Sequence, residues 1–148
     1  MPDIQLSDKD GKTFSPADLK GKKVVLFFNE GLMCYPACWN QMAQLSSDAR
    51  LNTNSVESYS IVLDQASNWG PAINQMPSLA QAKVLYDVGG DVSREYGMLK
   101  AGSSMHYGIY PGHSYVVIDA QGIVKYIFDD PRMAINNDKI AEQVQELK

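Results

Sequence analysis

The sequence predicts an α/β fold in which a central mixed sheet is flanked by helices. A continuous apolar run at residues 24–28 predicts a strand buried on both faces. Further short apolar runs alternate with segments of helical periodicity, an order typical of layered α/β proteins. Two late apolar runs, at 114–118 and 123–128, enclose a turn at 119–122. They predict a hairpin that adds antiparallel pairing to the sheet.

The first half of the chain supplies the remaining early elements. Residues 4–6 alternate in polarity before a turn at 10–11, and predict a strand. A capping pattern at 15–18 predicts a short helical turn. Residues 36–50 predict a helix with an apolar stripe, and 59–63 a second buried strand. The stripe is formed by Cys38, Met42, Leu45 and Ala49.

The second half continues the alternation. Two prolines, Pro71 and Pro77, exclude one continuous helix over 69–81. We expect a short strand at 84–86 and a short helix at 91–96 that ends at Gly97. Apolar spacing near the end of the chain predicts a final helix capped by Asn137 or Asp138.

Composition narrows the function classes. The chain has 148 residues, 45% of them hydrophobic, which suits a single domain over 1–148. Its net charge of −4, without a basic run, argues against nucleic acid or an anionic membrane as partner. The longest apolar run is too short to cross a bilayer, and no signal peptide is visible. We therefore expect a cytoplasmic protein, or an extracytoplasmic one if an export signal has been removed.

The two cysteines, Cys34 and Cys38, lie in one short segment after the predicted central strand. Such a pair does not form a structural disulfide framework. Because proline is tolerated only in the first turn of a helix, Pro36 indicates that the helix begins at or just after Cys34. Free N–H groups and the helix dipole stabilise a thiolate at that position. We therefore expect Cys34 to lie in an exposed turn and to act as the nucleophile.

The spacing of the pair allows two chemistries. On a regular helix, residues four apart have Cβ atoms about 5–6 Å apart, whereas a disulfide needs about 3.5–4.5 Å. A Cys34–Cys38 disulfide therefore requires a distorted first turn, and a metal ion that bridges the sulfurs tolerates the wider gap. Cys38 also fits a plain core role on the apolar stripe.

Two histidines, His106 and His113, lie in the loop that precedes the strand at 114–118. In a sheet with helices on both faces, this loop can approach the turn that carries Cys34. Either histidine can stabilise a thiolate or bind a metal, with Met105 as a further soft ligand. For His106, an ordinary loop role is the simpler expectation. For His113, an ordinary loop role and a role at the cysteines are equally good interpretations.

Two neighbours of the cysteines are supporting candidates. Glu30 precedes Cys34 by four residues and can relay protons. A solvated loop charge is the simpler interpretation of this residue. Trp39 follows Cys38 and either shields the thiols or packs in the core.

These residues resemble the redoxin branch of the thioredoxin superfamily, the alkyl hydroperoxide reductase and thiol-specific antioxidant (AhpC/TSA) family. Three segments follow the family pattern in order: DIQLSDKDGKTFSPADLKGKKVVLFF, VLYDVGGDVSREYGM and YVVIDAQGIVKY. The resemblance implies a thioredoxin fold with an N-terminal β-hairpin as in peroxiredoxins. It also implies that Cys34 attacks and that Cys38 resolves.

The pattern departs from typical peroxiredoxins at three places. Gly31 stands where the family has Thr or Ser, and Phe27 stands where the family has Pro. His113 lies near the place of the family's activating arginine. The resemblance therefore implies disulfide exchange or weak peroxide reduction rather than fast peroxide reduction. Pro111 is a candidate for the cis-proline that faces the active site in many such folds.

A second resemblance is to the copper-binding Sco/SenC proteins, which use a C-x-x-x-C pair and a distant histidine followed by serine. Cys34, Cys38 and His113 match this pattern, although Tyr35 and Trp39 replace the usual prolines. This resemblance implies a copper metallochaperone that binds the metal through these three residues.

The leading hypothesis is a thiol-disulfide oxidoreductase or peroxiredoxin-like antioxidant protein that requires no cofactor. Cys34 attacks a disulfide or peroxide, and Cys38 closes an internal disulfide. A thioredoxin-like protein or a low-molecular-weight thiol then restores the dithiol. The alternative is copper binding.

Overall fold

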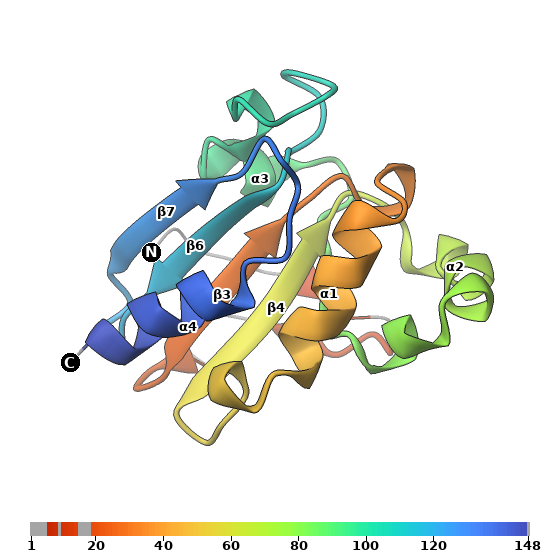
Figure 1. The fold of residues 1–148 in the computed structure, drawn as a ribbon. Helices are drawn as coiled ribbons and strands as arrows, with labels where there is room; N and C mark the ends of the chain where they lie inside the picture. Colours follow the sequence, from red (N-terminus) through yellow and green to blue (C-terminus); the bar gives the residue numbers. More distant parts are fainter. Residues whose placement is uncertain (1–5, 9, 15–18, 148) are drawn as a thin grey trace.

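A computed structural model describes residues 6–8, 10–14 and 19–147. It confirms the predicted α/β fold, with a mixed sheet of strand order β2-β1-β5-β4-β3-β6-β7 (Figure 1). Residues 4 and 5 of the first predicted strand and the predicted helical turn at 15–18 lie outside the described residues. The strands are β1 (Leu6–Ser7), β2 (Thr13–Phe14), β3 (Lys23–Phe28), β4 (Val56–Val62), β5 (Val84–Tyr86), β6 (Ser114–Ile118) and β7 (Val124–Asp129).

The predicted central strand forms the middle of the sheet. β3 pairs in parallel with β4 and antiparallel with β6, and its residues from Val24 to Phe28 are all buried. Since β-branched and aromatic side chains fit a pleated sheet covered on both faces, the apolar run forms a strand there. Both predicted hairpins are present, as β1–β2 and β6–β7.

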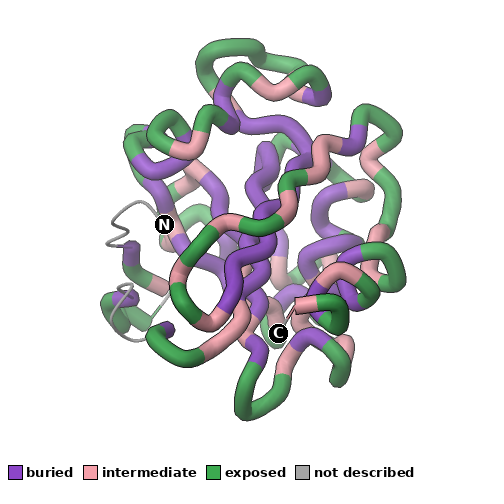
Figure 2. Tube along the Cα trace, turned by 90° about the vertical axis from the view of Figure 1, so that its left-hand side faces the viewer, coloured by how far each residue is buried: buried purple, intermediate pink, exposed green. Residues whose placement is uncertain are grey.

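Helices cover both faces of the sheet. Figure 1 shows α1 (Ala37–Ser47) and α4 (Asn137–Glu146) in front of the sheet and α3 (Asp91–Glu95) behind it. Two clusters of buried apolar side chains separate these layers, one on each face. Figure 2 shows the buried backbone concentrated in the middle of the molecule, with exposed loops around it. In the described part of the chain, no helix is long and apolar enough to cross a membrane.

The shorter elements agree with the proline and glycine signals. The prolines split residues 70–81 into α2 (Gly70–Gln75) and the 3₁₀ helix η5 (Pro77–Gln81), as predicted. Gly97 follows α3 with a left-handed φ of 77°, also as predicted. The other 3₁₀ helices are η2 (Gly31–Met33), η3 (Ala49–Leu51), η4 (Ala66–Asn68) and η6 (Met98–Lys100).

Two details of the predicted helices are wrong. Ala49 is exposed, because α1 ends at Ser47 and the chain then turns into η3. The N-cap of α4 is Asn136 rather than Asn137 or Asp138. Neither residue at 137 or 138 caps the helix because the helical backbone already begins at Asn137.

Candidate active site

The segment between β3 and α1 carries both cysteines. Cys34 follows η2, and α1 begins only at Ala37 with Pro36 as its N-cap. The helix therefore begins within one residue of the predicted range of 36–50, and Cys34 lies three residues before its first residue. The physical reason is that a residue before proline is disfavoured in helical geometry, which keeps Tyr35 out of the helix.

Cys34 and Cys38 are joined in a disulfide, with their Cα atoms 5.3 Å apart. Cys38 lies in the first turn of α1, whereas Cys34 lies before it. The regular helical spacing that opposes a disulfide therefore does not apply to the pair. The N–H group of Cys38 donates to the carbonyl oxygen of Cys34 over 3.0 Å, which fixes the backbone of the loop.

The two sulfur-bearing residues differ in their access to solvent. Cys38 is 0% exposed and Cys34 is 4% exposed. The expectation of an openly exposed Cys34 is therefore wrong for the disulfide form, because Met133 covers it with a sulfur 3.9 Å from Cys34 Sγ. Exposed Met33 and Tyr35 flank the disulfide. An incoming reactant consequently meets Cys34 before Cys38.

Gly31 shapes the turn before Cys34. Its φ is +62°, and a Cβ at this position would overlap Oδ2 of Asp64. That oxygen accepts the N–H of Leu32 over 3.0 Å. The Thr or Ser of typical peroxiredoxins therefore cannot fit at this position without rearrangement. The carbonyl oxygen of Gly31 accepts hydrogen bonds from the Cys34 N–H and from Nε1 of Trp39, both over 3.0 Å.

Trp39 packs in the core, which is one of the two roles predicted for it. It is buried, and its ring lies 4.8 Å from that of Tyr35, which flanks Cys34. On its other side it packs 6.3 Å from the ring of Trp69. Through these contacts and its bond to Gly31, Trp39 holds the cysteine turn against the core.

Glu30 is not a solvated loop charge, and the simpler expectation for it is wrong. Its side chain is buried, and its two carboxylate oxygens bind the loop that precedes β6. One accepts the N–H of Met105 over 2.8 Å, and the other lies 2.9 Å from Nδ1 of His106. Glu30 and His106 therefore tie two loops together beside the cysteine segment.

His113 lies next to the disulfide, on the Cys38 side. Its Nδ1 is 3.5 Å from Cys38 Sγ, and its side chain is fully buried. Nε2 lies 2.8 Å from the carbonyl oxygen of Ala134, which can only accept a hydrogen bond. Nε2 therefore carries the proton of the neutral ring, and the lone pair of Nδ1 faces Cys38. Burial lowers the pKa of His113, which favours this neutral form.

A buried polar network holds the histidine in place. The hydroxyl of Tyr115 lies 2.9 Å from Nε2 of His113 and donates to Oε1 of Gln41 over 2.7 Å. Asn136 donates from its side chain to the Tyr115 hydroxyl over 3.1 Å and from its backbone to the same Gln41 oxygen over 2.7 Å. The network therefore orients the ring from the side opposite Cys38.

Sequence reasoning missed Gln41, Tyr115, Asn136 and Met133. Gln41 carries a visible signal, since it is a polar residue three positions after Cys38 on the buried side of a helix. Tyr115 follows His113 by two residues, so the strand directs both side chains to one face of the sheet. Asn136 and Met133 lie in a loop after β7, and no local pattern indicates their contact with residues so distant in the sequence.

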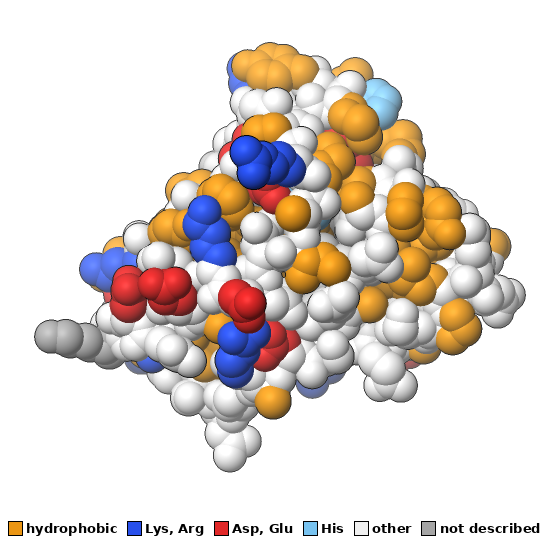
Figure 3. Space-filling model, viewed as in Figure 1, with side chains coloured by type: hydrophobic (Ala, Val, Ile, Leu, Met, Phe, Trp, Pro, Cys, Tyr) orange, Lys and Arg blue, Asp and Glu red, His pale blue; other side chains and the backbone are white. Residues whose placement is uncertain are grey.

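Pro111 is not the cis-proline that it was considered to be. The cis peptide bond in this region precedes Pro36, and the bond before Pro111 is not cis. Pro111 is buried two residues before His113. The side chain of Met105 is 58% exposed, while its backbone binds Glu30. Figure 3 shows hydrophobic side chains gathered over the upper right of this face of the molecule, where a histidine also reaches the surface.

Comparisons with known proteins relate the chain to one family. The sequence pattern of the AhpC/TSA family matches residues 1–127. The chloroplastic peroxiredoxin Q of Triticum aestivum is 30% identical over 135 residues, which cover 87% of this chain and 57% of that protein. The chain thus spans little more than half the length of this curated relative.

Solved structures share the fold. AhpC from Enterococcus faecalis superposes with a TM-score of 0.82 at 17% identity, over 98% of this chain and 87% of that one. Peroxidoxin BcpB from Mycobacterium tuberculosis gives a TM-score of 0.75 at 20% identity, over 100% and 95% of the two chains. These likenesses confirm the predicted thioredoxin fold of the peroxiredoxin type.

Proposed function

Because the chain belongs to the AhpC/TSA family, we propose that it is a thiol-dependent oxidoreductase in which Cys34 attacks the substrate and Cys38 resolves the product. The observation that carries the proposal is the disulfide between two buried residues of unequal access, in which only Cys34 keeps some solvent exposure. A sulfur that exchanges with an external partner must be reachable, and a resolving sulfur need only reach the first.

The first step takes place at Cys34 in the reduced protein. Its thiolate attacks the outer oxygen of a hydroperoxide, the O–O bond breaks, and the leaving alkoxide takes a proton to become an alcohol. Cys34 becomes a sulfenic acid. With a disulfide substrate, the same thiolate displaces one thiolate and forms a mixed disulfide.

The second step needs the thiolate of Cys38. Nδ1 of His113 faces this sulfur and takes its proton. The Cys38 thiolate then attacks the sulfur of Cys34 and closes the internal disulfide. The leaving group is hydroxide from the sulfenic acid or a thiolate from the mixed disulfide, and it is released as water or a thiol after taking up a proton.

The shape of the turn favours disulfide exchange or slow peroxide reduction. Gly31 offers no hydroxyl to a bound peroxide, and Asp64 and Val62 occupy the space that a side chain there would need. His113 is neutral and directed at Cys38, so it does not supply a positive charge at the peroxide. A thioredoxin-like protein or a small thiol attacks Cys34 to restore the dithiol, and a protein reductant would contact the exposed side chains of Met33 and Tyr35.

Steady-state turnover tests this function. The protein would be reduced continuously by a thioredoxin system or by dithiothreitol, with hydrogen peroxide in one arm and a small-molecule disulfide in the other. We expect turnover in both arms, faster with the disulfide, and its loss in Cys34→Ser. Turnover that persists in Cys34→Ser, or a protein inert in both arms, would refute the proposal.

A second candidate function is copper binding, favoured by the 3.5 Å approach of His113 Nδ1 to Cys38. Reduction of the disulfide would release two thiolates beside an imidazole lone pair, and this donor set suits copper. In the disulfide-bonded form, no group of three His, Cys, Asp or Glu side chains within the described residues forms a metal site. Copper binding would therefore require the dithiol.

Copper titration of the reduced protein separates the two functions. A metallochaperone would bind cuprous or cupric ions stoichiometrically, with a thiolate-to-copper absorption band for the cupric form. Binding would be lost in both His113→Ala and Cys38→Ser. Turnover of disulfide without stoichiometric copper binding would leave the oxidoreductase as the function.

A further inference from the structure

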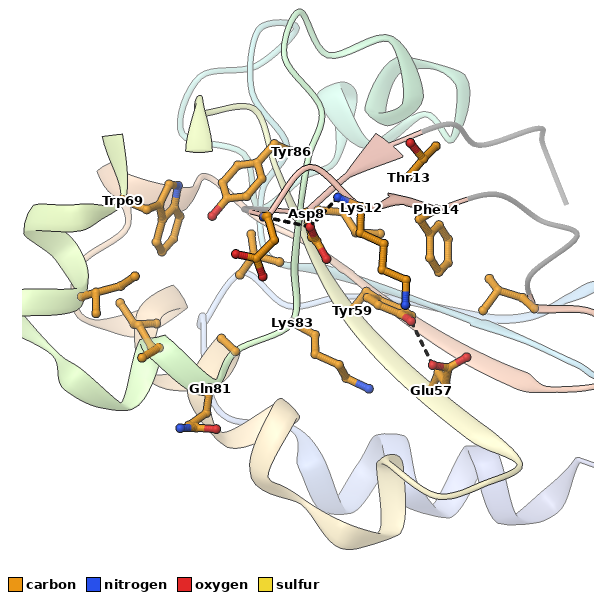
Figure 4. A pocket seen from close by; sticks show the side chains of 18 of the residues that line it. Asp8, Lys12, Thr13, Phe14, Glu57, Tyr59, Trp69, Gln81, Lys83 and Tyr86 are labelled. Atoms are coloured by element: carbon orange, nitrogen blue, oxygen red, sulfur yellow. Dashed lines mark hydrogen bonds between the residues drawn. The ribbon is translucent and has the colours of Figure 1, made fainter. Parts of the chain in front are cut away.

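A cavity of about 600 Å³ lies apart from the disulfide, between the β1–β2 hairpin, β4, β5 and the α2–η5 segment (Figure 4). None of its described lining residues is a cysteine or a histidine. Its volume falls in the range of about 300–1,000 Å³ that is typical of small-molecule sites. The cavity is therefore large enough for a ligand with an aromatic or branched apolar body.

Aromatic side chains form much of its wall. The rings of Phe14 and Tyr59 meet edge to face with centroids 4.6 Å apart, and those of Trp69 and Tyr86 do so at 6.2 Å. Leu79 adds an aliphatic surface. Such walls favour a flat apolar body, because aromatic rings that stack or meet edge to face gain free energy beyond that of burying apolar surface.

Lys83 supplies a positive charge at this cavity. Its Nζ lies 5.0 Å from the centre of the Tyr59 ring, and in Figure 4 the side chains of Lys83 and Lys12 both extend toward that ring. Among the described residues, no carboxylate lies within ion-pair distance of Lys83. Burial lowers the pKa of Lys83, which means that its charge lacks full compensation by water.

Two of the three acidic side chains at the cavity have ion-pair or hydrogen-bond partners. Glu57 pairs with Lys22 over 3.2 Å and accepts a hydrogen bond from Tyr59 over 2.9 Å. Asp8 accepts the backbone N–H groups of residues 10 and 12, each over 2.9 Å, and Asp10 is exposed. Among the described lining residues, Lys83 and Lys12 therefore have no carboxylate partner, and Asp8 and Asp10 have no cationic one.

Trp69 supplies an unused hydrogen-bond donor in the same wall. The residue is 2% exposed, and its Nε1 has no hydrogen-bond partner among the described residues. A buried N–H without an acceptor costs about 1–3 kcal/mol. An acceptor on a ligand in the cavity would satisfy it.

We propose that this cavity is a second binding site, separate from the disulfide, for a small aromatic carboxylate. The apolar body lies between the aromatic walls, and the carboxylate pairs with Lys83, with Lys12 as the second cation. The site goes beyond the redox function, and its ligand binds without a change in the cysteines.

Calorimetric titration with 2-naphthoate tests the site in the oxidised protein. The uncharged 2-naphthylmethanol serves as the matched ligand, since it has the same ring system without the charge. Lys83→Gln removes the charge, Lys83→Arg keeps it, and Lys100→Gln alters an exposed lysine elsewhere. Thermal unfolding of each variant verifies that it is folded.

We expect saturable binding of 2-naphthoate that weakens about tenfold in Lys83→Gln, as befits the loss of one charge-assisted hydrogen bond. Lys83→Arg and Lys100→Gln should bind like the parent protein, and 2-naphthylmethanol should bind more weakly than 2-naphthoate. Absence of saturable binding up to about 1 mM, the weak end of specific affinity, would overturn the proposal. Equal affinity in Lys83→Gln would overturn it as well. Since neither readout involves the cysteines, failure here leaves the proposed redox function untouched.

Discussion

His113→Gln tests the proton transfer that the geometry assigns to His113. Nδ1 of this ring faces Cys38 Sγ at 3.5 Å, and Nε2 donates to the carbonyl oxygen of Ala134 at 2.8 Å. Glutamine can retain a donor toward Ala134, but it has no basic nitrogen for Cys38. The variant should therefore slow the attack of Cys38 on Cys34 and leave the reaction of Cys34 with substrate unchanged.

The size of the effect follows from the thiolate fraction of Cys38. A cysteine without a base has a pKa of about 8.5 and is about 3% thiolate at pH 7. Removal of His113 should thus slow disulfide closure by up to about 30-fold at pH 7. The deficit should shrink about tenfold for each pH unit up to about 8.5. The parent protein should show little pH dependence over this range, since burial keeps His113 neutral.

Stopped-flow absorbance with dithiobis-nitrobenzoate measures this step separately. Cys34 of the reduced protein releases one coloured thiolate as it forms the mixed disulfide, and Cys38 releases the second as it closes the internal disulfide. We expect an unchanged first phase and a slower, strongly pH-dependent second phase in His113→Gln. His106→Gln is the matched control, because this histidine contacts Glu30 rather than a cysteine. A second phase in His113→Gln with the rate and pH profile of the parent protein would refute the assignment.

Three other perturbations test the packing of the site. Gly31→Ala should lower the free energy of unfolding by about 1–3 kcal/mol through its left-handed φ and the overlap with Asp64, measured by urea denaturation. Gly122→Ala has a similar φ but open space around it, so an equal loss there would exclude the overlap as a cause. Glu30→Gln should speed hydrogen exchange at the Met105 N–H about tenfold, because it weakens a charge-assisted hydrogen bond. The surface variant Asp91→Asn is the control. Unchanged exchange in Glu30→Gln, or an equal effect in Asp91→Asn, would contradict a role of the buried carboxylate. The oxidised protein should lose stability as the pH falls below about 6.5, the ordinary pKa of histidine. The reason is that burial lowers the pKa of His113, so the unfolded chain binds this proton more readily than the folded one. Denaturation measured from pH 7.5 to 5.5 should show a smaller loss of stability in His113→Gln than in the parent protein. Identical pH profiles of stability in the two proteins would count against a neutral buried ring.

The framework of the sheet could be predicted because local signals agree with the final packing. The apolar run at 24–28 becomes the central strand, and the prolines at 71 and 77 break the helix where expected. The start of α1 could not be predicted as well. Pro36 is compatible with several positions in the first turn, and the backbone of Tyr35 decides between them.

The candidate site was harder to predict, because its contacts join distant parts of the chain. The pairing of Cys34 with Cys38 is local and was one of the two chemistries left open by the spacing. Burial of Glu30 depends on Met105 and His106, about 75 residues later in the sequence. Sequence indicated that His113 could approach the cysteines, but only the fold shows that it faces Cys38.

Mass analysis of the reduced protein after one equivalent of hydroperoxide tests the order of the two sulfurs most directly. The parent protein should lose two hydrogen atoms as the internal disulfide closes. Cys38→Ser should instead gain one oxygen atom, located at Cys34 by peptide mapping and trapped by a sulfenic-acid reagent. An oxygen atom gained at Cys38 in Cys34→Ser, with Cys34 of Cys38→Ser left unmodified, would contradict the assignment of Cys34 as the attacking sulfur.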